Sequence, residues 1–188
     1  IDPNPEEMRA RMIEAIDLIL RMWKEGPFDF DGNYYSIRKP EPRPEMEVAF
    51  HMRPYQTPHP PIAVAGGSVK SATLELAGER GWLPLSAGNL MHTSQITSNW
   101  ESIEAGASRS GRTPLKADWR INKQIYVAET TELARKEALN GALARDFSKY
   151  WTKLIGNSPG RGLGIFKSDS EMRDRDVTPE YMLDNYWI

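Results

Sequence analysis

The strongest chemical signal in the sequence is a glycine pair between an apolar run and a helical pattern. The run reads Val64-Ala65-Gly66-Gly67-Ser68-Val69-Lys70-Ser71. Glycines let the backbone approach a ligand closely, and free N–H groups at a helix N-terminus favour a phosphate, to which the Ser68 and Ser71 hydroxyls could add donors. Taken alone, the run is explained more simply as a tight turn in which Ser68 caps the helix. It matches neither a P-loop nor the six-residue dinucleotide fingerprint.

A second candidate group lies on a predicted strand. Alternation along this strand places Arg120, Asn122 and Gln124 on one face. Polar side chains that face a barrel interior near a strand end are candidate ligand contacts, so Arg120 and Asn122 are candidate substrate-binding residues. The same residues could form the solvated face of an edge strand, and the sequence leaves both interpretations open.

Composition excludes several classes of function. The chain of 188 residues has no cysteine, and its three histidines lack metal-ligand spacing, so we expect no disulfide and no metal site. No Gly-x-Ser-x-Gly motif supports a serine hydrolase. The net charge of −2 gives no indication of nucleic-acid binding. Apolar runs fall short of the roughly 18–20 residues of a membrane span, and the N-terminus does not read as a signal peptide, so we expect a cytoplasmic protein without membrane contact.

The elements expected from apolar spacing alternate between helices and strands. Asn4 and Pro5 predict the start of a helix that ends at Gly26-Pro27, with an apolar stripe that faces a core. An aromatic hairpin over 28–37 and a proline-rich irregular segment over 39–60 follow. The later elements are strands at 61–66, 82–87 and 119–128, a helix that reaches Gly81, helices near 96–107 and 131–155, and a short helix at 179–185.

This alternation predicts an α/β fold with βαβ units, a parallel sheet and helices outside it. Two architectures are compatible with it, a (β/α) barrel and an open doubly wound sheet. A barrel needs eight strands and about 250 residues. Because three strong parallel strands are visible, a barrel would be incomplete. Segments 39–60 and 157–178 are rich in proline or charge, have few apolar anchors and should be the least ordered.

Several runs, taken in order, resemble the bacterial-luciferase-like flavin-dependent monooxygenases. They lie at a helix end, at a hairpin turn, at the glycine pair and in the helix after it. These runs are Ile19-Leu20-Arg21-Met22-Trp23-Lys24-Glu25-Gly26-Pro27, Phe30-Asp31-Gly32-Asn33-Tyr34-Tyr35, Pro60-Pro61-Ile62-Ala63-Val64-Ala65-Gly66-Gly67-Ser68 and Leu76-Ala77-Gly78-Glu79-Arg80-Gly81. The run 125–130 resembles the family's strand before its long helix, and the tail over 166–184 is similar to the limonene-monooxygenase-like branch.

The resemblance implies a fold and a cofactor. Family members are (β/α)8 TIM barrels, so residues 1–188 would form one incomplete luciferase-like barrel domain with the middle and later strands. The first four strands would precede Ile1, and the last would begin near Ile188. The cofactor would be reduced FMN, supplied by a separate reductase, rather than the deazaflavin of some branches. The reduced flavin would activate O2 and insert one oxygen atom into a small organic substrate.

The resemblance also assigns site residues. In the family, the turn that matches Gly66, Gly67 and Ser68 contacts the flavin phosphate, which reverses the preference for a purely capping role. Ser71 carries over less securely than Ser68, and Gly88 falls at the same end of the barrel. The catalytic residues stay unassigned.

Two other functions remain compatible with the sequence. One is a non-catalytic flavin-binding or interaction protein derived from the same fold, which a short chain would fit. The other is an open-sheet nucleotide-binding domain. Many family members dimerise, and an incomplete barrel would expose strand edges and part of the first helix, so we also expect a homo-oligomer or association with a second copy.

Overall fold

A computed structural model describes residues 4–47, 52–157, 162–169 and 171–187. The chain divides into two compact units, Ile1–Pro61 and Ile62–Ile188. The first unit contains a helix, a hairpin and a short 3-10 turn: α1 (Pro5–Lys24), β1 (Phe28–Asp31), β2 (Ser36–Lys39) and η1 (Pro44–Met46).

Helix α1 begins as the sequence predicts. The Asn4 side chain accepts hydrogen bonds from the backbone N–H groups of Glu6 and Glu7, and Pro5 occupies the first turn. The expectation of a core-facing stripe holds only in part, because Met8 is 52% exposed and Ile19 43% exposed. Within this unit the two-stranded ribbon of β1 and β2 packs on α1. Because a two-stranded ribbon covers only one side of a helix, part of the apolar stripe stays exposed.

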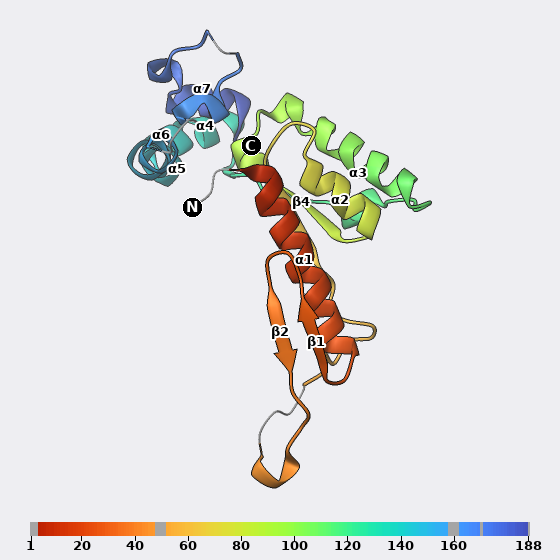
Figure 1. The fold of residues 1–188 in the computed structure, drawn as a ribbon. Coiled ribbons are helices and arrows are strands. Elements are labelled where there is room, and N and C mark those ends of the chain that lie inside the picture. Colours follow the sequence, from red (N-terminus) through yellow and green to blue (C-terminus); the bar gives the residue numbers. More distant parts are fainter. Residues whose placement is uncertain (1–3, 48–51, 158–161, 170, 188) are drawn as a thin grey trace. The chain divides into compact units, whose positions relative to one another are not determined.

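The hairpin forms as predicted and is joined to α1 by a carboxylate. Strands β1 and β2 pair antiparallel, from Phe28 opposite Lys39 to Asp31 opposite Ser36. The Glu14 carboxylate accepts hydrogen bonds from the backbone N–H groups of residues 33, 34 and 35 at 2.9–3.0 Å. Figure 1 shows the hairpin running beside α1.

The second unit contains a small sheet and most of the helices. Its strands and larger helices are β3 (Ala63–Gly66), α2 (Ala72–Arg80), β4 (Leu83–Ser86), α3 (Thr97–Arg109), β5 (Arg120–Ile121), α4 (Thr131–Asn140), α5 (Ala142–Asp146), α6 (Thr152–Gly156) and α7 (Pro179–Asn185). A π-helical turn, η5 (Phe147–Trp151), joins α5 to α6, and 3-10 turns lie at η2 (Gly88–Leu90), η3 (Thr93–Gln95), η4 (Lys116–Asp118), η6 (Gly162–Phe166) and η7 (Asp174–Asp176).

The three strands form a parallel sheet in the order β3-β4-β5, which confirms the predicted βαβ alternation. The prediction of a strand over 119–128 was wrong in length, because β5 has two residues. Its partner β4 ends at Ser86, and the last backbone hydrogen bond runs from Asn122 N–H to the Ser86 carbonyl at 3.0 Å. A strand cannot continue its ladder past the end of its partner.

The two faces of the sheet differ. Val64 and Ser86 are buried on the face that α2 and α3 cover, whereas Ala63 and Ala65 on the opposite face are exposed. Helices α2 and α3 approach very closely, since an added Cβ at Gly106 would lie 1.8 Å from the Glu75 carbonyl oxygen. The helices therefore form a tight layer on one side of the sheet (Figure 1).

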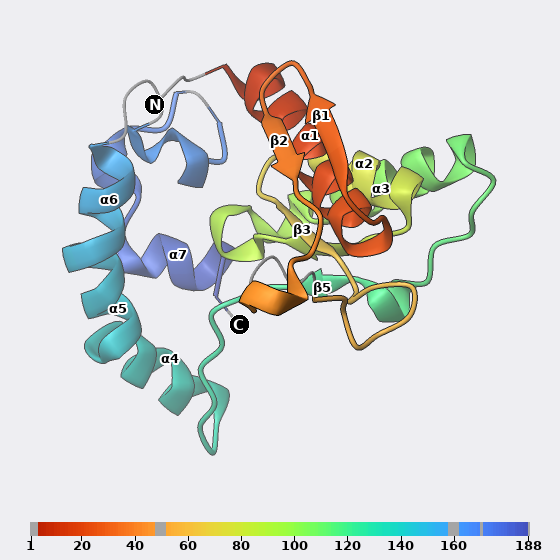
Figure 2. The same cartoon turned by 60° about the horizontal axis from the view of Figure 1, so that its bottom comes forward.

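The long helix predicted over 131–155 is interrupted. Gly141 has φ −105° and ψ −150°, which is not helical, so α4 ends at Asn140 and α5 begins at Ala142. Glycine loses more conformational entropy than other residues in a helix, so a break there is physically reasonable. Figure 2 shows α4, α5 and α6 following one another along a curved path.

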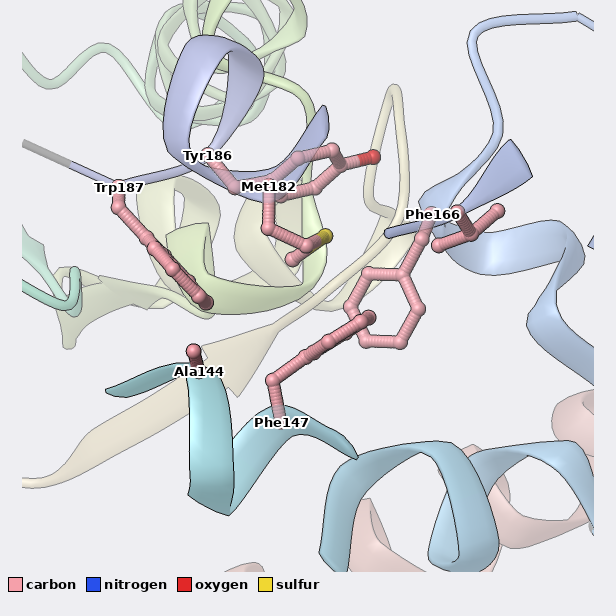
Figure 3. Packing of buried hydrophobic residues seen from close by; sticks show 7 residues of the cluster. Ala144, Phe147, Phe166, Met182, Tyr186 and Trp187 are labelled. Atoms are coloured by element: carbon pink, nitrogen blue, oxygen red, sulfur yellow. The ribbon is translucent and has the colours of Figure 1, made fainter. Parts of the chain in front are cut away.

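An aromatic cluster packs these helices against the tail of the chain. The buried residues of this cluster are Ala144, Phe147, Phe166, Val177, Met182, Tyr186 and Trp187. In Figure 3 Met182 and Trp187 point toward Ala144 and Phe147. The expectation that 157–178 has few apolar anchors was wrong for the described part, because Phe166 is 1% and Val177 5% exposed. Residues 158–161 and 170, also in that range, lie outside the described residues.

The segment 39–60 is irregular, as its prolines predict. Past β2 its described part contains only the turn η1, with Tyr55 fully exposed, and residues 48–51 lie outside the described residues. No helix in the described ranges of the chain has the length and apolar character needed to cross a membrane.

Candidate functional site

The glycine pair lies at the carboxyl end of the sheet, where Gly66 is the last residue of β3 and Gly67 begins the loop after it. Gly66 is buried, and a Cβ there would lie 2.3 Å from Ser71 Oγ and 2.7 Å from Leu74 Cγ. Any side chain at position 66 would therefore push the strand end away from the first turn of α2. The absence of a side chain lets the chain turn tightly from the strand into the helix.

The two serines of the loop have different environments. Ser71 is 3% exposed, and its hydroxyl caps α2 by accepting a hydrogen bond from Leu74 N–H at 3.4 Å. Ser68 lies outside the helix and is exposed. The interpretation of Ser68 as the helix cap was therefore wrong. Since Ser71 performs that role, the Ser68 hydroxyl is available to a ligand.

The loop also presents unpaired backbone donors. Among the described residues, the N–H groups of Gly67, Ser68 and Val69 have no hydrogen-bond partner, whereas Lys70 N–H donates to Ser98 Oγ. Lys70 is exposed and adds a positive charge. Adjacent free N–H groups beside a hydroxyl and an ammonium group suit an anion such as a phosphate.

The structure brings a second pair of predicted residues together. A Cβ added at Gly88 would lie 2.7 Å from the Asn122 carbonyl oxygen, so the loops after β4 and β5 touch there. The loops after β3 and β4 are also adjacent, because a Cβ added at Gly67 would lie 3.4 Å from Ala87 Cβ. Gly67, Ser68, Gly88 and Asn122 therefore belong to three neighbouring loops at one end of the sheet, where Gly66 ends β3.

Arg120 occupies a different place. It pairs with Leu85 inside the ladder, and its guanidinium donates to the Ala117 carbonyl at 2.5 Å, toward the start of β5. Asn122 lies after the strand and is exposed. A role for Asn122 in substrate binding stays a prediction, and the structure does not group Arg120 with the carboxyl-end loops.

A buried polar group beneath the loops was not predicted. Ser86 is fully buried at the end of β4, and its hydroxyl accepts hydrogen bonds from Asn99 Nδ2 at 3.0 Å and Trp119 Nε1 at 2.8 Å. These contacts join β4 to α3 and to the residue before β5. A serine at the end of an apolar strand was the available signal, but its partners lie 13 and 33 residues away in the sequence.

Lys123 is the second residue that sequence reasoning missed. Its ammonium group donates to the Tyr186 carbonyl at 2.9 Å, the Met91 carbonyl at 3.3 Å and Thr93 Oγ1 at 3.2 Å. Partial burial lowers the pKa of Lys123 by desolvation. Lys123 therefore joins the loop after β4 to the end of α7. No local sequence motif predicts these long-range hydrogen bonds.

Comparisons with known proteins match the chain to one family. The family model of the luciferase-like monooxygenases matches residues 3–180. The chain is 24% identical over 184 residues to 3,6-diketocamphane 1,6-monooxygenase of Pseudomonas putida, covering 93% of this chain and 47% of that protein. It is 27% identical over 142 residues to limonene 1,2-monooxygenase of Rhodococcus erythropolis, covering 74% and 34%. The chain thus spans about half the length, or less, of these relatives.

One relative uses another cofactor, according to its name. The chain is 28% identical over 134 residues to an F420-dependent hydroxymycolic acid dehydrogenase of Mycobacterium tuberculosis, covering 70% of this chain and 32% of that protein. Among solved structures, the oxygenating constituent of 3,6-diketocamphane monooxygenase from the CAM plasmid of Pseudomonas putida, in complex with FMN, has a TM-score of 0.75 at 24% identity. The match covers 98% of this chain and 50% of that one. With a shared α/β fold and a family match over nearly its whole length, the chain belongs to the luciferase-like monooxygenase family.

Proposed function

We propose that this chain carries the flavin-phosphate site of an FMN-dependent monooxygenase. Such an enzyme would use reduced FMN and O2 on a small organic substrate. The observation that carries the proposal is the loop after β3, where Gly67, Ser68 and Val69 have free backbone N–H groups among the described residues. Membership of the family supports the same reading, and it favours an enzyme over a non-catalytic flavin-binding or interaction protein.

The residues of this loop fit a phosphate. Glycine at position 66 keeps the loop close to the first turn of α2, and Ser71 leaves the Ser68 hydroxyl free by capping the helix itself. Gly67, Ser68 and Val69 would hold the phosphate through backbone N–H groups, with Lys70 supplying opposite charge. When bound, reduced flavin supplies the electrons that activate O2. The task of this chain is then to hold and orient the cofactor.

The proposal also covers the fold of the domain and the residues that lie near the substrate. Three consecutive parallel strands with helices on one face suit part of a (β/α)8 barrel. Residues 1–188 would then supply the middle and later strands of one barrel domain. Gly88 is proposed to lie beside the cofactor, and Asn122, whose backbone it approaches at the same end of the sheet, is a proposed neighbour of the substrate.

The cofactor and partners follow from the relatives. FMN is proposed because the solved relative contains it, and F420 is the alternative because another relative is named for it. A separate reductase would supply reduced FMN, and a homo-oligomer is the expected assembly. Both proposals rest on the family resemblance.

Anaerobic titration of the purified chain tests the cofactor. We expect reduced FMN to bind more tightly than reduced riboflavin, which has the same ring system without the phosphate. Reduced F420 should bind more weakly than FMN. Equal affinity for FMN and riboflavin would refute a phosphate site, and a clear preference for F420 would refute the choice of cofactor while leaving the anion site intact.

A further inference from the structure

The aromatic cluster of the second unit borders a small, partly enclosed cavity of about 10 Å³ with partly polar walls. Phe147, Phe166 and Trp187 are among the apolar residues that line it, and Asn89 and Gln124 are among the polar ones. A cavity needs roughly 10–15 Å³ of this kind of volume to hold one water molecule. The volume of this cavity therefore lies at the lower limit for a single water molecule.

Two residues that line this cavity each have a buried amide oxygen with no hydrogen-bond partner among the described residues. These oxygens are Asn89 Oδ1 and Gln124 Oε1, and Asn89 as a whole is only 8% exposed. A buried amide oxygen left without a hydrogen bond costs about 1–3 kcal/mol. Two such oxygens on one small cavity would be unusual in a stable protein, because buried polar groups are normally paired with protein or with ordered water.

We propose that one buried water molecule occupies this cavity and bridges Asn89 to Gln124. Water donates two hydrogen bonds and also accepts, so it satisfies a terminal amide whichever end of the amide faces the cavity. Apolar cavities stay dry, but two amides give this one the polar partners that a trapped water needs. An ammonium ion has a similar size, and Asp146 also lines the cavity. The Asp146 carboxylate, however, already accepts a hydrogen bond from Trp151 Nε1 at 2.9 Å and is exposed.

The water would connect two segments of the candidate site. Asn89 follows Gly88 in the loop after β4, and Gln124 lies two residues beyond Asn122. Gly88 and the Asn122 backbone already touch, so the bridge would form a second link between the same two loops, on the side of the helices α5 and α7. This site does not depend on the proposed flavin chemistry.

A double-mutant cycle tests the bridge by measuring whether the effects of two substitutions on the unfolding equilibrium depend on each other. Asn89→Leu and Gln124→Met each remove one amide, and each should raise the unfolding equilibrium constant about tenfold by leaving the other amide unpaired. If one water serves both, the double variant should also lose only about tenfold rather than a hundredfold. Gln56→Met, at an exposed glutamine, is the matched control and should change nothing. Independent, multiplicative losses would overturn the proposal.

Two measurements on the unaltered chain identify the occupant. Cross-relaxation between the side-chain amide protons of Asn89 and Gln124 and a long-lived water should be visible by NMR. Its absence would mean that the amides contact each other directly, and it would overturn the proposal. Melting temperatures should agree in ammonium chloride and sodium chloride at equal ionic strength, whereas specific stabilisation by ammonium would make the occupant a cation.

Discussion

The close contact between α2 and α3 gives the sharpest prediction about stability. Gly106 of α3 lies against the backbone of α2, and an added Cβ would be 1.8 Å from the Glu75 carbonyl oxygen and 2.7 Å from its carbonyl carbon. Ordinary contact begins at 3.4 Å. Because the added Cβ of α3 would clash with backbone atoms of α2, no side-chain rotation relieves the clash. Gly106→Ala must therefore move the two helices apart by well over an ångström.

The expected loss follows from two opposing effects. Overpacking a well-packed site costs about 1–3 kcal/mol, and a backbone clash belongs near the upper end of that range. Separation of the helices would also loosen Leu74 and Ile103, which are 0% and 1% exposed. Alanine in a helix gains roughly 1 kcal/mol over glycine. We expect a net loss of about 2 kcal/mol in the free energy of unfolding.

Urea denaturation of purified variants measures this loss. With a slope of about 1–3 kcal/mol per molar urea, the midpoint should fall by roughly 1 M. Ser108→Ala is the matched control, because Ser108 is an exposed residue of the same helix and should gain at most about 0.5 kcal/mol from its better helix propensity. A Gly106→Ala protein as stable as the parent, or more stable, would refute the packing argument.

Three further changes test single contacts. The pKa of Glu14 is lowered because its three backbone hydrogen bonds outweigh the desolvation that raises it. The stabilisation from this carboxylate is therefore present above the unfolded-state pKa and lost as pH falls through the folded one, and Glu14→Gln should remove that acid-dependent change and speed amide exchange at residues 33–35. Lys39 is 7% exposed and donates to the Met22 and Glu25 carbonyls, so Lys39→Met should cost about 1–3 kcal/mol in urea denaturation, and an unchanged midpoint would contradict it. Lys123→Met should speed amide exchange in α7 without affecting α2, and equal exchange rates in both proteins would show that Lys123 does not hold that helix.

The sequence predicted the features that are local. The turn from β3 to α2 depends on residues within a few positions of one another, namely a short apolar run, two glycines and a helical stripe. The start of α1 at Asn4 and Pro5 is local in the same sense. The alternation of strands and helices was therefore sufficient to predict a parallel α/β arrangement before any tertiary contact was known.

Several of the features that the sequence did not predict depend on distant partners, and others were local but ambiguous. The length of β5 is set by where β4 ends, and the capping role of Ser71 rather than Ser68 depends on where α2 begins. The break at Gly141 had a local signal, a glycine inside a helical pattern, which was outweighed by the length of that pattern. The contacts of Lys123 and the unpaired amides of Asn89 and Gln124 follow from packing, which no spacing rule reveals.

Mapping the flavin phosphate by NMR tests the proposed function most directly. Titration of the isotopically labelled chain with FMN should shift the backbone amides of Gly67, Ser68 and Val69, and riboflavin should leave them unchanged. Ser68→Ala should weaken FMN binding by about 1 kcal/mol, or roughly fivefold, while Ser108→Ala should bind as the parent does. FMN shifts confined to other residues, or equal FMN affinity in the Ser68→Ala variant, would contradict the assignment of this loop.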